Sequence, residues 1–554
     1  MTKKLLFYLL LAAFCIRFLY LSQFAGSPFF RPARGLDPYL YQSWALSLLD
    51  GGWFGTEVFK AMPLYPYLLA LFYALCGRDL FFVYALQLLV GVLNCFLLYR
   101  LGKLLEGPPL GLLSAFFLAF SGVSIFYEAM LVPTVVVSCS LLFTLLIVSH
   151  AKTSKAWFLG GVAWGLSALA HAGILLWSPF LILAGLFGDS QRSFSKKTLA
   201  LGGCLLAFLS LLSLSALRNF LAAGETVFFT AHGGINFFIG NNPEATGQFH
   251  SHFTRYTSAE QLFQQSKREA ERQTGHPLTD GESSRFWFQR GMTFVRENPV
   301  AFLRLLRQKW SLFWNGYEIP DVEDFYFFRR EFPILKFAPF QSAFLSPLAL
   351  LGICLSVRAW RRFFLLYGML GAMIVGMLLF FVNSRYRAPL LPILSLFASF
   401  GCLRLVGFLR QKQPYALLGS LFLLFHLALW TGTDLPVVEG GIGHYNAAIA
   451  YTHAGLFDKA IQQLNRALLT TQDEGMVHFA LGNAYFGQGN FEKAAEEFQE
   501  TVRDHPDFAD AAFNLGVTSA KLNRKKEARE ALHRALELDP EARDIRRELE
   551  KLGE

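Results

Sequence analysis

Residues that could do chemistry appear first in the stretch GLDPYLYQSWALSLLDGGWFG, from Gly35 to Gly55. Asp37 lies near its start, directly after the first long apolar run, and aromatic side chains follow it, Tyr41 among them. A carboxylate there can be the N-cap of a helix, with Pro38 at the first helical position. It can equally be a general base that deprotonates a hydroxyl group. This stretch alone leaves both roles open.

Three more charged residues lie between apolar runs and are candidates for substrate binding. Glu128 follows an apolar helix, where it can orient a substrate or be an ordinary interfacial carboxylate. Arg385 and Arg387 suit a lipid phosphate, which arginine binds in bidentate fashion, and contact with lipid headgroups is the alternative. The sequence shows no Walker motif and no metal-ligand spacing. We therefore predict no nucleotide-sugar donor, cofactor or metal site, and we leave a divalent-cation requirement open.

The composition of the chain indicates where these residues lie. The chain has 554 residues, of which 53% are hydrophobic and 16% charged, and its mean hydropathy is +0.36. A soluble core cannot bury that much apolar surface, so the composition predicts an all-α polytopic membrane protein. The net charge of +9 falls in short clusters between apolar runs, which indicates orientation in a membrane and no nucleic-acid partner.

About eleven runs reach spanning length, and basic residues indicate their orientation. The shorter run 63–77 is predicted to lie on the membrane surface, because every strong basic cluster then falls on the side of the N-terminus. The N-terminus is therefore predicted to be cytoplasmic, in a multi-pass protein of the plasma (inner) membrane. The predicted spans are 4–24, 81–103, 108–127, 131–149, 156–171, 173–188, 198–217, 342–357, 363–382, 387–407 and 414–431.

The predicted domains follow from these runs. An N-terminal membrane module, 1–217, contains the external loop 25–80, in which the chemistry is expected. An external insertion, 218–340, is mixed and partly helical, with amphipathic helices at 258–275 and 298–316. The last membrane helices occupy 341–432.

After residue 440 the composition turns soluble, and small residues recur with a 34-residue period, as in Ala460, Ala494 and Ala528. This period resembles the tetratricopeptide repeat. We predict an α-solenoid over 444–554, with three repeats in 444–542 and a short final helix. With eleven spans, the solenoid lies on the outer side with Asp37, where it is expected to hold an acceptor or a protein partner.

The membrane part, roughly residues 1–430, resembles the GT-C glycosyltransferases, in the branch of protein O-mannosyltransferases and the lipid A aminoarabinose transferase. The likeness lies in the order of four stretches: GLDPYLYQSWA, KAMPLYPYLLALFYALCG, FSGVSIFYEAMLVPTVV and NSRYRAPLLPILSLFASFG. It implies a polyprenyl-phosphate sugar as donor and an acidic base in the first external loop, Asp37 by position. It also implies Lys60 as a second cation for the phosphate. Relatives often carry a basic residue where this chain has His171.

A lipid phosphate leaves as a stabilised anion, so one carboxylate base and cations on the phosphate suffice, whereas glycosidases need two carboxylates. The expected function is sugar transfer to an extracytoplasmic glycan, lipid or protein acceptor, with Tyr41 among the substrate-binding residues. Two alternatives stay open. An O-antigen-ligase-like oligosaccharide transferase would use His or Arg in place of Asp37, and a non-enzymatic membrane scaffold bearing the repeats would need none of these outer charges.

Overall fold

The computed structural model describes residues 2–187, 193–225, 227–249, 259–321, 323–433, 441–469 and 474–553. This described part folds into α-helices and short 3-10 helices, as the composition predicts. The backbones of Ser121 and Pro339 form an isolated antiparallel β-bridge.

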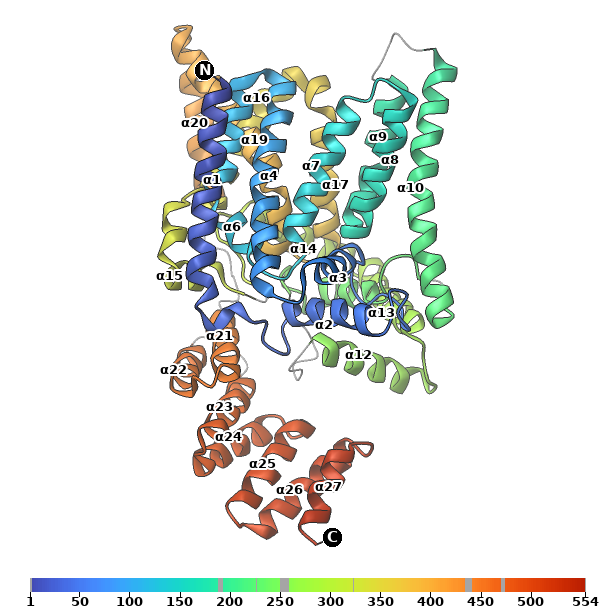
Figure 1. The fold of residues 1–554 in the computed structure, drawn as a ribbon, viewed down its shortest axis with the longest axis vertical. Helices are drawn as coiled ribbons and strands as arrows, with labels where there is room; N and C mark the ends of the chain where they lie inside the picture. The colour runs from blue at the N-terminus through green and yellow to red at the C-terminus, as the bar shows by residue number, and fades with distance from the viewer. Residues whose placement is uncertain are drawn as a thin grey trace.

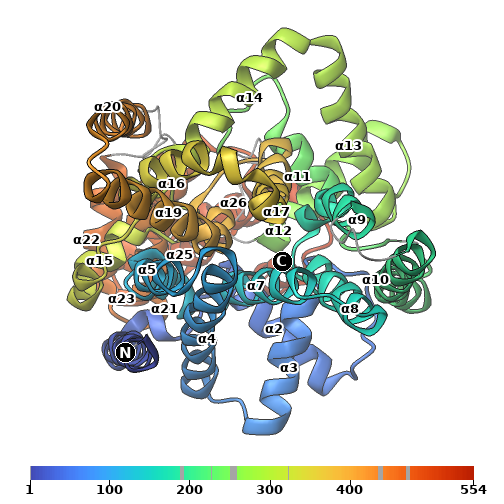
Figure 2. The same cartoon turned by 90° about the horizontal axis from the view of Figure 1, so that it is seen from above.

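One set of helices runs side by side along a common axis (Figure 1) and is seen end-on in Figure 2. Their boundaries follow local signals: the Asp79 side chain accepts a hydrogen bond from the Phe81 backbone at the start of α4, and Gly107, with a φ of +97°, ends it. The bundle helices are α1 Thr2–Ala25, α4 Leu80–Glu106, α5 Pro108–Ala119, α6 Gly122–Glu128, α7 Thr134–Ser149, α8 Ser154–Ala170, α9 Ser178–Phe187, α10 Phe194–Ala223, α16 Ser342–Ser356, α17 Trp360–Leu379, α19 Leu391–Arg410 and α20 Pro414–Thr431.

The structure supports fewer long spans than the eleven predicted. Several predicted spans fold into shorter apolar helices of 10–17 residues, whereas a crossing takes about 20 residues. The run 108–127, for example, is interrupted between α5 and α6, where Ser121 pairs with Pro339. Six helical stretches of the described chain are long and apolar enough to cross a membrane: Thr2–Ala25, Leu80–Glu106, Phe194–Ala223, Ser342–Leu379, Ser384–Arg410 and Pro414–Thr431.

A second set of helices gathers at the end of the bundle away from the N-terminus (Figure 1). Helices α2 and α3 are seen lengthwise in Figure 2, so they lie across the bundle axis, as predicted for a surface helix at 63–77. Two of the helices that follow in 218–340, α12 and α14, match the predicted amphipathic segments. The bounds are α2 Asp37–Asp50, α3 Leu64–Cys76, α11 Gly233–Gly240, α12 Ala259–Thr274, α13 Asp280–Glu297, α14 Pro299–Trp314 and α15 Phe325–Glu331.

Short 3-10 helices and one single-turn α-helix connect these elements. The 3-10 helices are η1 Pro28–Phe30, η2 Ala172–Trp177, η3 Pro333–Phe337, η4 Val357–Ala359 and η5 Ala388–Leu390, and α18 spans Ser384–Arg387.

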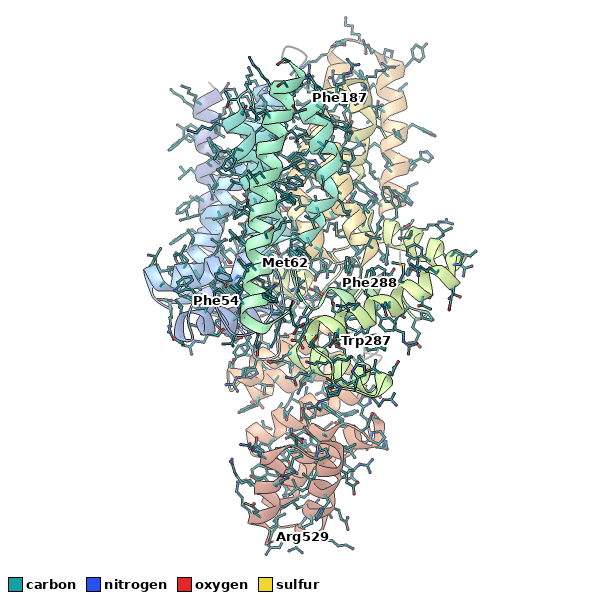
Figure 3. All side chains as sticks on the ribbon, turned by 90° about the vertical axis from the view of Figure 1, so that its right-hand side faces the viewer. Phe54, Met62, Phe187, Trp287, Phe288 and Arg529 are labelled. Atoms are coloured by element: carbon teal, nitrogen blue, oxygen red, sulfur yellow. The ribbon has the colours of Figure 1, made fainter. Side chains whose placement is uncertain are left out.

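The C-terminal repeats fold into helix pairs, which confirms the period predicted from the sequence. Ala460, Ala494 and Ala528 are fully buried at equivalent positions. Figure 3 shows Phe187 at one end of the bundle, Trp287 of α13 near the other, and Arg529 at the tip of the repeats. The repeat helices are α21 Ile442–His453, α22 Phe457–Leu468, α23 Glu474–Gln488, α24 Phe491–Asp504, α25 Ala509–Lys521 and α26 Lys525–Leu538, followed by α27 Arg543–Lys551.

Since α2 and the repeats share one end of the molecule (Figure 1), we expect both to face the extracytoplasmic side. Single cysteines at Trp53 and Glu492, placed in a cysteine-free background, should react with a membrane-impermeant thiol reagent added to intact cells. A cysteine at Ser154, an exposed residue at the start of α8, should react after lysis alone. Protection of the Glu492 position in intact cells would contradict this orientation.

Candidate active site

Asp37 is the first residue of α2, and it is not the N-cap that one interpretation of the sequence required. Leu36 occupies the cap position, and its side chain has no oxygen with which to cap the helix. The Asp37 carboxylate lies in the first turn, where the helix dipole favours a negative charge. Its side chain retains 22% of its exposure, so a small group can still reach it from solvent.

The partner of Asp37 is Arg385, which lies 348 positions later in the chain. Nη1 of Arg385 contacts Oδ2 of Asp37, and its Nε lies 2.8 Å from Oδ2 of Asp321. The Nη2 group donates to the Tyr386 hydroxyl at 3.3 Å. Arg385 is 11% exposed and Asp321 9%. The structure therefore brings two predicted residues together, and it adds Asp321, which the sequence analysis missed.

Tyr41 lies one helical turn after Asp37, and its ring packs edge-on against Tyr65 with centroids 5.3 Å apart. Burial raises the pKa of the Tyr41 phenol above its ordinary value; the Asp37 carboxylate raises it further, while Arg385 opposes the shift. The phenol therefore keeps its proton at physiological pH. A neutral phenol beside the Asp37–Arg385 pair can donate a hydrogen bond to a substrate oxygen.

Arg385 is positioned by α18, whose start is firmly held. The Asn383 side chain accepts a hydrogen bond from the Tyr386 backbone at 2.8 Å and so caps this turn. The Ser384 backbone donates to the Ile319 carbonyl at 3.0 Å, and its hydroxyl donates to Glu318 at 2.8 Å. These contacts tie the turn that carries Arg385 to residues preceding Asp321.

Arg387 lies two residues further and is buried away from Asp37. Its guanidinium pairs with Glu318 at 2.7 Å and donates to the carbonyls of Phe313 (3.0 Å), Asn315 (2.6 Å) and Tyr317 (2.8 Å). Burial alone would raise the pKa of Glu318, but Arg387 and hydrogen bonds from Ser342 and Ser384 lower it below its ordinary value. In this arrangement Arg387 holds the segment after α14 against α18.

Hydrogen bonds from two side chains hold the C-terminal end of α17, which precedes the turn that carries Arg385. Asn241 donates to the Leu379 carbonyl at 2.7 Å, and Lys309 donates to the Leu378 carbonyl at 3.0 Å and to the Asn241 side chain at 3.2 Å. Burial lowers the pKa of Lys309 to about 7. Asn241, directly after α11, and Lys309 of α14 thus fix the backbone that leads to α18.

Glu128 is placed inside the bundle, in a bidentate ion pair with Arg17 of α1. Arg17 Nε and Nη2 lie 2.7 and 2.9 Å from its two carboxylate oxygens, and the Ser124 hydroxyl donates to it at 2.8 Å. Both charged side chains are at most 3% exposed. Gly91 of α4 makes the approach possible, because a Cβ atom there would overlap the carboxylate. This pair joins α1 to α6, and Arg17 had no role assigned from the sequence.

Lys60 lies on the rim of a separate cleft next to α2. Its ammonium pairs with Glu57 at 2.7 Å, and its backbone carbonyl accepts a hydrogen bond from Thr230 at 2.6 Å. The cleft has a volume of ≈ 300 Å³ and is lined by α2, α11, α12 and α13, with Leu40 of α2 bordering it. Lys60 can therefore act on a ligand that enters beside α2, and no ion pair joins it to Asp37 among the contacts of the described residues.

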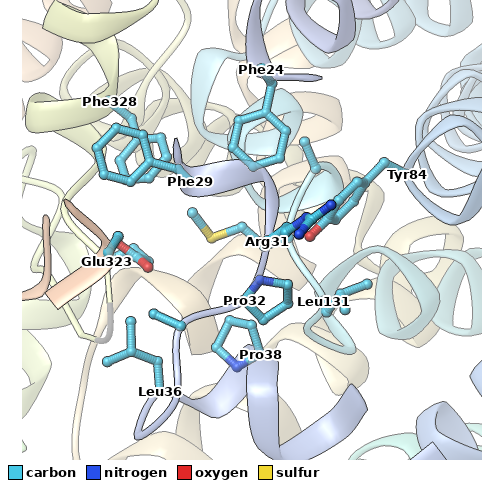
Figure 4. Close-up of a pocket in the computed structure, with 14 residues that line it drawn as sticks. Phe24, Phe29, Arg31, Pro32, Leu36, Pro38, Tyr84, Leu131, Glu323 and Phe328 are labelled. Atoms are coloured by element: carbon cyan, nitrogen blue, oxygen red, sulfur yellow. The ribbon is translucent and has the colours of Figure 1, made fainter. Parts of the chain in front are cut away.

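A smaller cavity, of about 20 Å³, lies on the other flank of Asp37 (Figure 4). Leu36 and Pro38 line it together with Glu323 and Phe328. Burial raises the pKa of Glu323 to about 8, and the neighbouring Asp324 carboxylate adds to the shift. Glu323 therefore carries a proton at neutral pH.

The described part of the chain contains no group of three or more His, Cys, Asp or Glu side chains that could hold a metal ion.

Comparison with known families matches two segments of the chain, one in the membrane part and one in the repeats. Residues 60–215 match the model of the dolichyl-phosphate-mannose-protein mannosyltransferase family, a segment that includes Lys60 and Glu128 and ends before Arg385. Residues 479–543 match the tetratricopeptide repeat, and residues 453–504 match the YpiA-like tetratricopeptide repeats. The search of curated proteins found no match.

Among solved structures, the chain is similar to ArnT from Cupriavidus metallidurans bound to undecaprenyl phosphate. They share 16% identity over 91% of this chain and 79% of that one, with a TM-score of 0.39. It is also similar to the oligosaccharyltransferase AglB from Archaeoglobus fulgidus in complex with an inhibitory peptide and a dolichol-phosphate. That match has 14% identity over 84% of this chain and a TM-score of 0.39, and the chain spans 59% of the archaeal enzyme's length. Residues 60–215 thus resemble the dolichyl-phosphate-mannose-protein mannosyltransferase family, and residues 453–543 resemble tetratricopeptide repeats.

Proposed function

We propose that this protein is a glycosyltransferase that moves one sugar from a polyprenyl-phosphate donor to a hydroxyl group of an extracytoplasmic acceptor, with Asp37 as the general base. The observation that carries the proposal is the contact between Asp37 and Arg385, a carboxylate and a guanidinium held together at the end of the bundle where α2 lies. A base and a phosphate-binding cation are the two groups that this transfer needs from the protein.

The acceptor oxygen attacks the anomeric carbon of the donor sugar, and the bond from that carbon to the phosphate oxygen breaks. Asp37 takes the proton of the acceptor hydroxyl, and the polyprenyl phosphate leaves as an anion that needs no proton. A positioned base of this kind contributes about 10²–10⁴-fold to the rate. The Asp37 side chain is 22% exposed and Arg385 contacts its Oδ2 atom, so we assign the acceptor proton to Oδ1.

Arg385 is the proposed phosphate ligand. A guanidinium has five N–H donors in a fixed plane. Hydrogen bonds to Asp37 and Tyr386 use two of them, and Nε forms an ion pair with Asp321. The remaining donors can bind a phosphate oxygen without loss of the carboxylate contacts. Bound there, the phosphate would lie next to Asp37 and the Tyr41 phenol. Lys60, on the rim of the neighbouring cleft, is proposed to attract the donor or contact the acceptor.

Arg387 and Glu128 take a different part in this proposal from the one the sequence suggested. Each is buried in an ion pair, Arg387 with Glu318 and Glu128 with Arg17. We therefore propose that they position α18 and α6 and do not contact the substrate. The acceptor is a glycan, lipid or protein, and the repeats are proposed to bind it or a partner protein.

The donor class can be tested with purified protein in lipid bilayers. We expect it to consume polyprenyl-monophosphate sugars and to release polyprenyl phosphate, and to leave nucleotide sugars unchanged. Arg385→Gln should weaken binding of a labelled polyprenyl-phosphate sugar at least about tenfold, since one charge-assisted bidentate contact contributes 1.4 kcal/mol or more. Arg361→Gln, which alters an exposed arginine beside Trp360, is the matched control and should bind normally.

The two alternatives predict other results in the same assay. Consumption of polyprenyl-diphosphate oligosaccharides in place of monophosphate sugars would favour an O-antigen-ligase-like transferase. If no donor is consumed and Arg385→Gln binds donor as wild type does, the proposed mechanism is wrong.

A further inference from the structure

The first repeat helix, α21, packs into the membrane part of the protein. Ala447, Ala448 and Tyr451 are at most 5% exposed, and they belong to the same apolar core as residues of α1 and α15. Gly443 lies so close to Asp324 that a Cβ atom added to it would be 2.5 Å from the Asp324 Cβ. Helix α21 is therefore built into the body of the molecule.

Helix α21 contacts η1, the 3-10 helix at the start of the segment that leads to Asp37. The Tyr451 ring meets the Phe29 ring edge-on, with centroids 5.2 Å apart. Phe29 also packs against Phe327 and Phe328 of α15, at 5.7 and 5.1 Å. Tyr451 thus closes one side of an aromatic cluster that fixes the position of η1.

The segment between η1 and α2 depends on such packing. Residues 31–36 are not helical, and their backbone forms a turn through a 3.3 Å hydrogen bond from Leu36 to Ala33. Ala450 of α21 lines the same small cavity as Leu36 and Pro38, the two neighbours of Asp37 (Figure 4). Helix α21 therefore adjoins this segment at Phe29 and again beside Asp37.

We propose that α21 braces the segment 28–38 and that Tyr451 is a positioning residue for the transfer reaction. The proposal rests on the proposed function, since it concerns the placement of Asp37 relative to donor and acceptor. Loss of the Tyr451 ring removes the side of the aromatic cluster that α21 supplies. Asp37 then keeps its chemistry but loses its fixed position, and a shift of about 1 Å in a reacting group can cost about 10²-fold in rate.

The chain contains an internal control for Tyr451. Tyr485 occupies the equivalent position one 34-residue period later, and Lys493 lies over its ring at 5.3 Å, as Lys459 lies over Tyr451 at 5.7 Å. The tyrosine–lysine contact within a repeat is thus common to both positions. The contact with Phe29 is made by Tyr451.

The test compares Tyr451→Ala, Tyr451→Phe and Tyr485→Ala in the full chain. We expect Tyr451→Ala to lower kcat by about 10- to 100-fold, with the KM for the donor within about twofold of wild type. Tyr451→Phe keeps the ring and should retain kcat, as should Tyr485→Ala. Hydrogen exchange of the amides in 28–38 should be faster in Tyr451→Ala than in the other two proteins. A kcat within twofold of wild type in folded Tyr451→Ala would overturn the proposal.

Gly443→Ala provides a second route if Tyr451→Ala does not fold. Its added methyl group must push α21 away from Asp324, so it should lower kcat and speed exchange in 28–38 without removal of any ring; unchanged kcat and exchange would overturn the brace. Failure of the proposed function is distinguishable from failure of the brace. If wild-type protein consumes no donor, the function is wrong, while the exchange rates of 28–38 in the variants still decide whether α21 holds this segment.

Discussion

Replacing Asp37 with asparagine is expected to lower the rate of sugar transfer by at least about 10²-fold, because an amide cannot accept the proton of the acceptor hydroxyl. Binding of the polyprenyl-phosphate donor should persist, since Arg385 keeps its second carboxylate partner, Asp321, at 2.8 Å. The measurement is the initial rate of transfer by purified wild-type and Asp37→Asn protein at saturating donor, with donor binding measured on the same samples. A loss in kcat with unchanged donor affinity identifies a group that acts in the transition state.

The same helix supplies the control for this experiment. Asp50 is the last residue of α2, and its exposed carboxylate pairs with Arg78 at the surface. Asp50→Asn makes the same chemical change at the other end of α2 and should transfer sugar at the wild-type rate. If Asp37→Asn stays within a few-fold of wild type, Asp37 is not the base.

The largest expected effect on stability comes from the buried pair of Arg17 and Glu128. Replacing Arg17 with methionine keeps an apolar side chain of similar length and leaves the Glu128 carboxylate buried with no cation. Removal of one partner of a buried ion pair costs about 3–5 kcal/mol. We expect a marked fall in the midpoint of thermal unfolding in detergent, and a partial recovery in the double variant Arg17→Met with Glu128→Gln, in which no charge remains at this site.

A surface pair gives the reference value for this comparison. Arg78 and Asp50 are 56% and 61% exposed, and such pairs contribute about 1 kcal/mol or less. Arg78→Met should therefore unfold close to the wild-type temperature. Equal shifts for Arg17→Met and Arg78→Met would show that the buried pair contributes no more than a surface contact.

The sequence predicts those features that repeat or that depend on a local signal. The 34-residue period identifies the repeats, and Pro38 marks the start of α2 to within one residue. Charge patterning places Asp37 and Arg385 near the same end of the bundle, where the structure finds them in contact. The surface helix at 63–77 follows from its short apolar run together with the basic clusters, which all fall on one side when this run does not cross the membrane.

Repeats and local sequence signals do not predict contacts between segments that are far apart in the sequence. Arg17 and Glu128 are 111 residues apart, and each residue alone is compatible with an interfacial charge. Asp321 lies in an irregular segment between α14 and α15, with no periodicity to mark it. The structure does not show all eleven predicted spans, because apolar runs such as 108–127 contain breaks; Ser121, in that break, pairs with Pro339.

The Arg17–Glu128 pair also bears on how the protein is made. Helix α1 is synthesised first, and its carboxylate partner follows 111 residues later. At about 5–20 residues per second, Glu128 leaves the ribosome some 6–22 s after Arg17. An unpaired arginine within a membrane helix disfavours insertion by up to about 2.5–3.5 kcal/mol, the cost at the helix centre. We therefore expect α1 to reach its full stability in the membrane late, when the nascent chain has extended to α6 and Arg17 can pair with Glu128.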